Sequence, residues 1–118
     1  MAEVQKMNKI MLVCSESGDM VDRYMRAVGS EVVKVSDGES AIRQAHRAVF
    51  DLVVVVSTGS VMDVAETVLN LSDIRPSTEI IMVREACGSA AETISHAFPN
   101  TKALTLNGLA EYLGLPSS

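Results

Sequence analysis

The sequence predicts an α/β protein in which helices cover both faces of a five-stranded parallel sheet, giving a three-layer sandwich. Along its 118 residues, short apolar runs alternate with segments whose apolar residues recur at helical spacing, as is typical of parallel α/β folds. The clearest run, 50–57, contains four consecutive valines without polar alternation, so it predicts a strand buried on both faces. Right-handed crossovers leave few strand orders, of which 2-1-3-4-5 is common at this size.

The first half of the chain contains three of the predicted strands. Residues 1–8 are polar and predict a flexible tail, so that a single domain spans 9–118. Gly29 is expected to cap the first helix at its C-terminus, and the polar character of the second strand suits an edge of the sheet. The predicted elements are a strand at 9–14, a helix at 20–28, a strand at 31–35, a helix at 40–49 and the strand at 50–57.

The second half begins with the helix whose periodicity is clearest, 61–74, with Ala65 and Leu69 among the residues expected to face the core. The segment 84–102 has the weakest helical pattern, because glycine and serine dilute it and Pro99 interrupts it. The remaining predicted elements are a strand at 79–83, a strand at 103–106 and a short helix at 108–113.

Composition limits the classes of function. With 15 acidic and 10 basic residues, the chain has a net charge of −5 and no basic stripe for nucleic acid or an anionic membrane surface. Aromatic residues make up 3% and tryptophan is absent, so no platform for stacking bases is expected. No apolar run approaches the ~18 residues of a membrane span. Two distant cysteines without metal spacing indicate free thiols, and we expect a cytoplasmic protein without membrane insertion or a nucleic-acid partner.

Three short motifs in register resemble the receiver domains of bacterial response regulators. VSDGESA at 35–41 is similar to the family's "DGxxAL" turn, and FDLV at 50–53 is similar to its "yDLVllD". Met62 and Asp63 occupy the place of the family's "MDG". The order and spacing of the elements resemble the family over nearly the whole chain. The resemblance implies the CheY-like, flavodoxin-like fold and a place in two-component, phosphorelay-type signal transduction.

The resemblance also shows where the chemistry of a receiver is missing. In the family, acids at the strand ends bind Mg²⁺ and an aspartate after the third strand accepts the phosphoryl group. The matching positions here are Cys14, Ser15 and Glu16 after the first strand, Val56 or, after a slip of one residue, Ser57 after the third, Arg84 after the fourth, and Leu106 or Asn107 after the fifth. A valine has no nucleophilic oxygen, and a hard cation does not settle on a thiol and a serine. We therefore expect a pseudo-receiver that is not an enzyme and holds no metal or cofactor.

The leading functional hypothesis is a stand-alone pseudo-receiver that acts as a phosphorylation-independent protein-interaction module. Active receivers signal through the face made of the last two helices and the fifth strand, and a loosely covered face there would be open to a partner. We expect the partner to be a signalling protein or a second copy of the chain. The candidate interaction face consists of Ile94, Phe98, Leu109 and Tyr112.

Two other hypotheses concern the strand ends. Cys14 and the small residues after it resemble the phosphocysteine loop of the small IIB proteins of sugar phosphotransferase systems, which implies a phosphocarrier. Glu16 and Asp19 interrupt that loop, and their carboxylates would repel a phosphate. A small-molecule binder at the carboxyl ends of the strands is the third hypothesis, although no aromatic or glycine-rich fingerprint supports it.

Arg84 has two interpretations of its own. It could neutralise Glu16 or Asp51 across the sheet edge, or it could be an ordinary solvated or paired arginine. The turn at 57–60 could likewise bind an anion at a helix N-terminus, although turn and capping chemistry explains its residues more simply.

Overall fold

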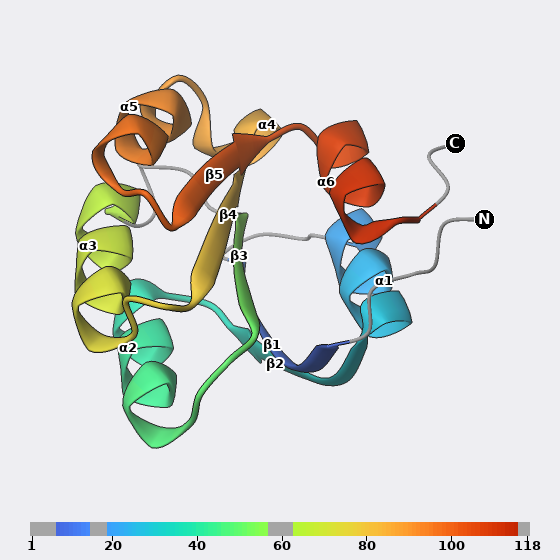
Figure 1. Ribbon diagram of the computed structural model, residues 1–118, viewed down its shortest axis with the longest axis horizontal. Helices are drawn as coiled ribbons and strands as arrows, with labels where there is room; N and C mark the ends of the chain where they lie inside the picture. Colours follow the sequence, from blue (N-terminus) through green and yellow to red (C-terminus); the bar gives the residue numbers. More distant parts are fainter. Residues whose placement is uncertain (1–6, 15–18, 57–62, 116–118) are drawn as a thin grey trace.

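The computed structural model describes residues 7–14, 19–56 and 63–115. It contains a five-stranded parallel sheet in the order β2-β1-β3-β4-β5, with helices on both faces (Figure 1). The predicted fold class and strand order are confirmed. In chain order the elements are β1 (Met7–Cys14), α1 (Asp19–Val28), β2 (Gly29–Val35), α2 (Gly38–Arg47), β3 (Leu52–Val56), α3 (Val64–Ile74), β4 (Glu79–Val83), α4 (Arg84–Cys87), α5 (Ala90–Ala97), β5 (Thr101–Leu104) and α6 (Leu106–Leu113).

The sheet separates two apolar layers. Helices α2, α3 and α5 lie on one side of it, and α1 and α6 lie on the other (Figure 1). Side chains alternate across a strand, so β1 sends Met11 and Val13 into the first layer and Ile10, Leu12 and Cys14 into the second. Aliphatic residues make up nearly all of both layers, as the composition of the chain requires.

The central strand β3 is buried on both faces, as its run of valines predicts. Leu52 through Val55 are buried and Val56, at the carboxyl end, is half-buried. Asp51 precedes the strand and joins it to the start of β1: its backbone N–H donates to the carbonyl of Lys9 at 2.8 Å, and its carboxylate accepts from the Lys9 N–H at 3.2 Å. Asp51 therefore lies at the amino end of β3, away from the end where a receiver carries its chemistry.

Several boundaries of the first half differ from the predictions: α2 and β3 begin and end at other residues than expected, and β1 and β2 begin earlier. β1 begins at Met7, so residues 7 and 8 belong to the sheet and not to the tail. Gly29 is the first residue of β2 and does not have the positive φ of a left-handed cap. Its requirement is space, because a Cβ there would lie 2.9 Å from Ile10 Cδ1 and 3.1 Å from the carbonyl oxygen of Met25. Glycine allows α1 to run directly into β2 at this close contact.

Helix α3 buries three of the residues predicted to face the core, Val64, Val68 and Leu71, and adds Thr67 to them. Asp63 caps it, with Oδ1 accepting from the Glu66 N–H at 3.0 Å. Thr67 is buried because its hydroxyl donates to the Asp63 carbonyl at 2.9 Å, which satisfies the polar group inside the core. The predicted inward positions Ala65 and Leu69 are wrong: both are exposed, and Leu69 retains 47% of its surface.

The segment with the weakest helical pattern forms two short helices, α4 and α5. Gly88 separates them with φ +67° and ψ −154°, a backbone conformation that a side chain disfavours. α5 is anchored by Ala91 and Ile94, which are buried against the sheet. The sequence predicted the interruption at Pro99, whereas the structure breaks the helix at Gly88 and α5 ends at Ala97, before the proline. Within the described ranges, no helix is long and apolar enough to cross a membrane.

Candidate functional site

The carboxyl ends of β1 and β3 lie side by side, with Cys14 as the Cα partner of Val56. Cys14 is 4% exposed, and both side chains pack into the apolar layer under α1 and α6. Ser15, Glu16 and Ser57, the other residues expected here, lie outside the described residues. The described part of this site therefore presents a thiol and an isopropyl group where a receiver has carboxylates.

Arg84 follows β4 and forms an ion pair with Glu92 of α5. The hypothesis that it neutralises Asp51 is wrong, because Asp51 lies at the opposite end of the sheet and contacts Lys9. Its neighbour Glu85 has a role that the sequence gave no reason to expect. The carboxylate oxygens of Glu85 accept from the N–H of Leu106 at 3.1 and 3.2 Å, linking α4 to the N-terminus of α6.

The end of the fifth strand also differs from the prediction. β5 ends at Leu104, and the residue directly after it is Thr105, which caps α6 by accepting from the Gly108 N–H at 3.0 Å. Leu106 and Asn107 therefore lie in the first turn of α6 and not at the strand end. A hydroxyl group, rather than leucine or asparagine, follows β5.

The four residues of the expected interaction face do not form one surface. Ile94 and Phe98 belong to the apolar layer beside α3, whereas Leu109 and Tyr112 belong to the layer beside α1. Leu109 is completely buried and Ile94 is nearly so, so Leu109 as a contact residue is wrong. Phe98 and Tyr112 remain partly exposed, on the two helical flanks of the edge strand β5.

Lys102 covers the middle of that edge. Its Nζ lies 4.8 Å from the centroid of the Tyr112 ring and 3.2 Å from Glu79 Oε2. A lysine on an edge strand opposes pairing with another strand, and its contact with the aromatic ring holds the tyrosine in place. We use the term β5 edge face for the surface formed by Lys102 and Tyr112 beside β5, on the side of α6.

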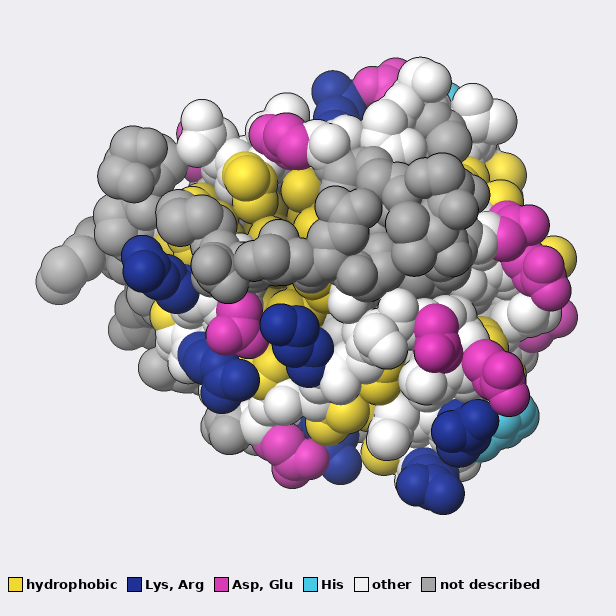
Figure 2. Space-filling view, turned by 180° about the vertical axis from the view of Figure 1, so that it is seen from behind, with side chains coloured by type: hydrophobic (Ala, Val, Ile, Leu, Met, Phe, Trp, Pro, Cys, Tyr) yellow, Lys and Arg dark blue, Asp and Glu magenta, His cyan; other side chains and the backbone are white. Residues whose placement is uncertain are grey.

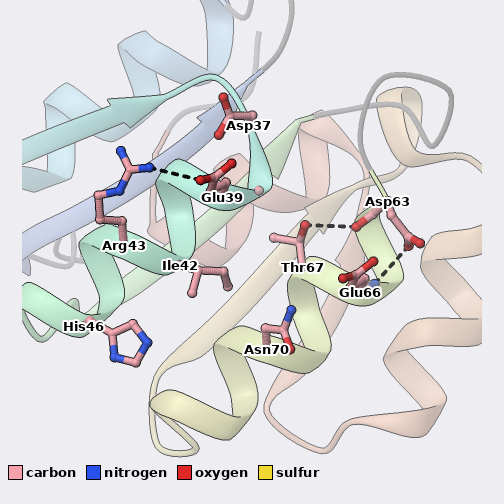
Figure 3. Close-up of a pocket in the computed structure, with 10 residues that line it drawn as sticks. Asp37, Glu39, Ile42, Arg43, His46, Asp63, Glu66, Thr67 and Asn70 are labelled. Atoms are coloured by element: carbon pink, nitrogen blue, oxygen red, sulfur yellow. Dashed lines mark hydrogen bonds and ion pairs between the residues drawn. The ribbon is translucent and has the colours of Figure 1, made fainter.

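A hollow of about 650 Å³ lies between α2 and α3 (Figure 3). Ile42 and Thr67 line its middle, and His46 and Asn70 lie at the end away from the helix N-termini. Four carboxylates line the end where the two helices begin, namely Asp37, Glu39, Asp63 and Glu66. We call this hollow the α2–α3 groove.

Most of these acids have structural roles. Asp37 caps α2, accepting from the Ser40 N–H at 2.7 Å, and this hydrogen bond holds the pKa of Asp37 below its usual value. Asp63 caps α3 in the same way. Glu39 pairs with Arg43, one turn along α2, at 3.3 Å. Helix capping and pairing therefore explain Asp37, Asp63 and Glu39 without a ligand. Across the parts of the chain that the structure describes, no group of three or more His, Cys, Asp or Glu residues could hold a metal ion.

A second hollow, of about 490 Å³, lies on the other exposed side of α2, at the carboxyl ends of β1 and β2. Dark blue and cyan side chains gather over α2 at the lower right of Figure 2, which shows the side opposite to Figure 1. Arg43 lines both hollows. We call the second hollow the basic pocket, and its lining is Cys14, Lys34, Val35, Ser36, Ser40, Arg43, Gln44 and Arg47.

The sequence analysis missed the basic pocket. The chain is acidic overall, and the three cations come from two elements that lie side by side only in the folded protein. The one local signal is Arg43 and Arg47, four residues apart on a helix and therefore on one face.

No protein-family model and no curated protein matches the sequence. Solved structures do match. The chain is similar to the Vibrio cholerae chemotaxis protein CheY4, with 24% identity, 92% of this chain and 97% of that chain covered, and a TM-score of 0.69. It is similar to a CheY-like response regulator receiver domain protein from Methanospirillum hungatei, with 16% identity, 92% of each chain covered and a TM-score of 0.70.

A third similar structure is the signal receiver domain of an HD domain-containing protein from Pseudomonas fluorescens, with 17% identity, 89% of this chain and 79% of that chain covered, and a TM-score of 0.66. These structures share the strand order and layers described above, so the fold is the CheY-like, flavodoxin-like fold. At such sequence identities the similarity establishes the fold and does not establish an activity.

Proposed function

We propose that this chain is a pseudo-receiver, a CheY-like domain that works as a protein-interaction module in two-component signalling without accepting a phosphoryl group. One observation carries the proposal. Cys14 and Val56 stand side by side at the ends of β1 and β3, and both pack into an apolar layer. Phosphoryl transfer in a receiver needs oxygen ligands for Mg²⁺ at these positions.

The energetics of the site support the same conclusion. A divalent cation placed against Cys14 and Val56 would lose hydration without gaining oxygen ligands from either side chain, which is unfavourable. Glu85, a carboxylate that follows β4, is already bound to the backbone N–H of Leu106 and serves the start of α6. The substitutions are therefore compatible with a stable fold and remove the chemistry.

A module of this kind acts through its surface, and the β5 edge face is the surface we assign to a protein partner or a second copy. Tyr112 supplies apolar area, and Lys102 supplies a charge beside its ring. An aromatic side chain with a partly exposed ring is a common anchor in protein interfaces.

A phosphocarrier that uses Cys14 is the second candidate, favoured by one observation. Cys14 is one of the residues that line the basic pocket together with Lys34, Arg43 and Arg47, and cationic side chains of this kind bind phosphate. Against it, only 4% of the cysteine is exposed, so a donor has little access to the sulfur.

Intact-mass analysis after incubation with acetyl phosphate and Mg²⁺ separates the candidates. The pseudo-receiver predicts no gain of mass. A gain of one phosphate that disappears in Cys14→Ser supports the phosphocarrier. A gain that persists in Cys14→Ser and is lost in acid indicates an acyl phosphate and overturns the proposal.

Hydrogen exchange tests the interaction surface, on dilute protein and again at high concentration or with the signalling partner. We expect association to slow exchange in 98–112 and Tyr112→Ala to weaken it. Leu69→Ala is the matched control, because Leu69 is an exposed apolar residue on α3. Protection confined to the residues around Cys14 would contradict the assignment of the β5 edge face.

A further inference from the structure

The basic pocket is lined by positive side chains, although the chain as a whole has a net charge of −5. Among the described residues, Lys34, Arg43 and Arg47 line it, and no aspartate or glutamate does. On the opposite side of the same helix, the α2–α3 groove carries four carboxylates. Helix α2 thus separates a negative hollow from a positive one, and helix capping and pairing explain most of the carboxylates of the negative one.

The cations of the pocket come from two rigid elements. Lys34 lies in β2, where it is the Cα partner of Leu12 in β1. Arg43 and Arg47 lie one turn apart on α2 and face the same hollow. Arg43 makes one bond, to Glu39, through a guanidinium group that has five N–H donors, so most of its donors remain available to a ligand.

The lining indicates the class of ligand. Guanidinium groups bind phosphate in a bidentate manner, and a lysine adds a point charge. Ser36 and Gln44 supply neutral hydrogen-bonding groups beside the cations, whereas Ser40 is engaged with Asp37. Among the described residues that line the pocket there is no aromatic ring to stack on a base. Its volume of about 490 Å³ suits a small molecule.

We propose that the basic pocket binds a small phosphorylated molecule, held by Arg43 and Arg47 and oriented by Ser36 and Gln44, with Lys34 at the rim of the pocket on the edge strand. This goes beyond the proposed function, because it requires neither a protein partner nor any reaction at Cys14. It gives the chain a ligand site on the flank of β2 and α2, at positions where the receiver resemblance assigns no chemistry.

The test is titration of the full chain with pyrophosphate and with glycerol phosphate, followed by backbone NMR and calorimetry at fixed ionic strength. We expect saturable binding with shifts concentrated at Lys34, Ser36 and Gln44. Arg47→Gln should weaken binding about tenfold, which corresponds to roughly one charge-assisted contact, and Lys34→Gln, at the rim, should weaken it less. Both residues are exposed, so the folds of the variants are expected to be intact.

Arg23→Gln is the matched control, because Arg23 is an exposed arginine on α1, away from the pocket lining, and its loss changes the net charge equally. Unchanged affinity in this variant supports a defined site. Equal weakening in all three variants would reveal general attraction to positive charge and overturn the proposal. So would the absence of saturable binding of either probe, or shifts located elsewhere. Retained binding in Cys14→Ser would show that the site is independent of the phosphocarrier candidate.

Discussion

Replacing Val56 with aspartate restores the acceptor group of a receiver, and we expect it to destabilise the protein without restoring phosphorylation. Full burial of a valine contributes about 1.5–3 kcal/mol, and Val56 is half-buried, so the lost contacts cost about 1 kcal/mol. A carboxylate packed against the apolar layer beside Cys14 adds about 1–3 kcal/mol for the unsatisfied polar group.

The sum, about 2–4 kcal/mol, corresponds to a fall of roughly 8–16 °C in melting temperature at about 4 °C per kcal/mol for a domain of this size. Burial raises the pKa of the introduced carboxyl group above its unfolded value. The destabilisation should therefore be largest at neutral pH and shrink as the pH falls through the raised pKa, because the neutral form is easier to bury.

Urea unfolding of Val56→Asp, Val56→Asn and Val56→Ala at pH 7 and pH 5 measures these terms separately. Val56→Ala reports the lost packing, and Val56→Asn reports a buried polar group without charge. Intact-mass analysis with acetyl phosphate and Mg²⁺ completes the experiment. Wild-type stability in Val56→Asp, or a phosphate on it, would show that the strand ends accommodate an acid and a metal and would refute the argument.

Three further predictions concern stability. Leu109→Ala should lower the free energy of unfolding by about 2–5 kcal/mol, because the side chain is completely buried. Tyr112→Ala should lower it clearly less. Equal losses of stability in chemical unfolding would contradict the division between core and surface. The lowered pKa of Asp37 means that its cap stabilises the fold above the unfolded pKa and is lost as the pH falls through the folded one, so Asp37→Asn should flatten the acid limb of the stability profile. Gly88→Ala should cost about 1–3 kcal/mol, since the position has φ +67° and nothing within 4 Å for a methyl group to contact; an unchanged unfolding midpoint would show that the backbone relaxes.

The parts of the fold that the sequence predicted best are those where one physical signal dominates. β4 was predicted with its observed bounds, Glu79–Val83, because an apolar run is flanked by polar residues. Thr67 was missed among the buried residues of α3 because its hydroxyl bonds to its own helix, which hydrophobic periodicity does not encode. The role of Gly29 was also mispredicted, as a helix cap. Its actual requirement, space beside Ile10, depends on how the sheet packs and has no local sequence signal.

The sequence predicted the candidate site only in those features that depend on the identity of one residue. A valine at the acceptor position is visible in the sequence, and the structure places it beside Cys14. The hydrogen bond from the Leu106 N–H to Glu85 joins residues 21 apart, and no local pattern marks it. The basic pocket likewise depends on how β2 packs beside α2, which brings Lys34 to the arginines of the helix.

The position of Arg43 between the two hollows of α2 has a thermodynamic consequence. One guanidinium group lines both the α2–α3 groove and the basic pocket, and it pairs with Glu39. An anion that draws Arg43 into the basic pocket weakens that pair and leaves the groove more negative. Linkage makes the effect reciprocal: a cationic group that binds in the groove engages Glu39 and releases Arg43 toward the anion, so each occupant raises the affinity for the other by the same factor.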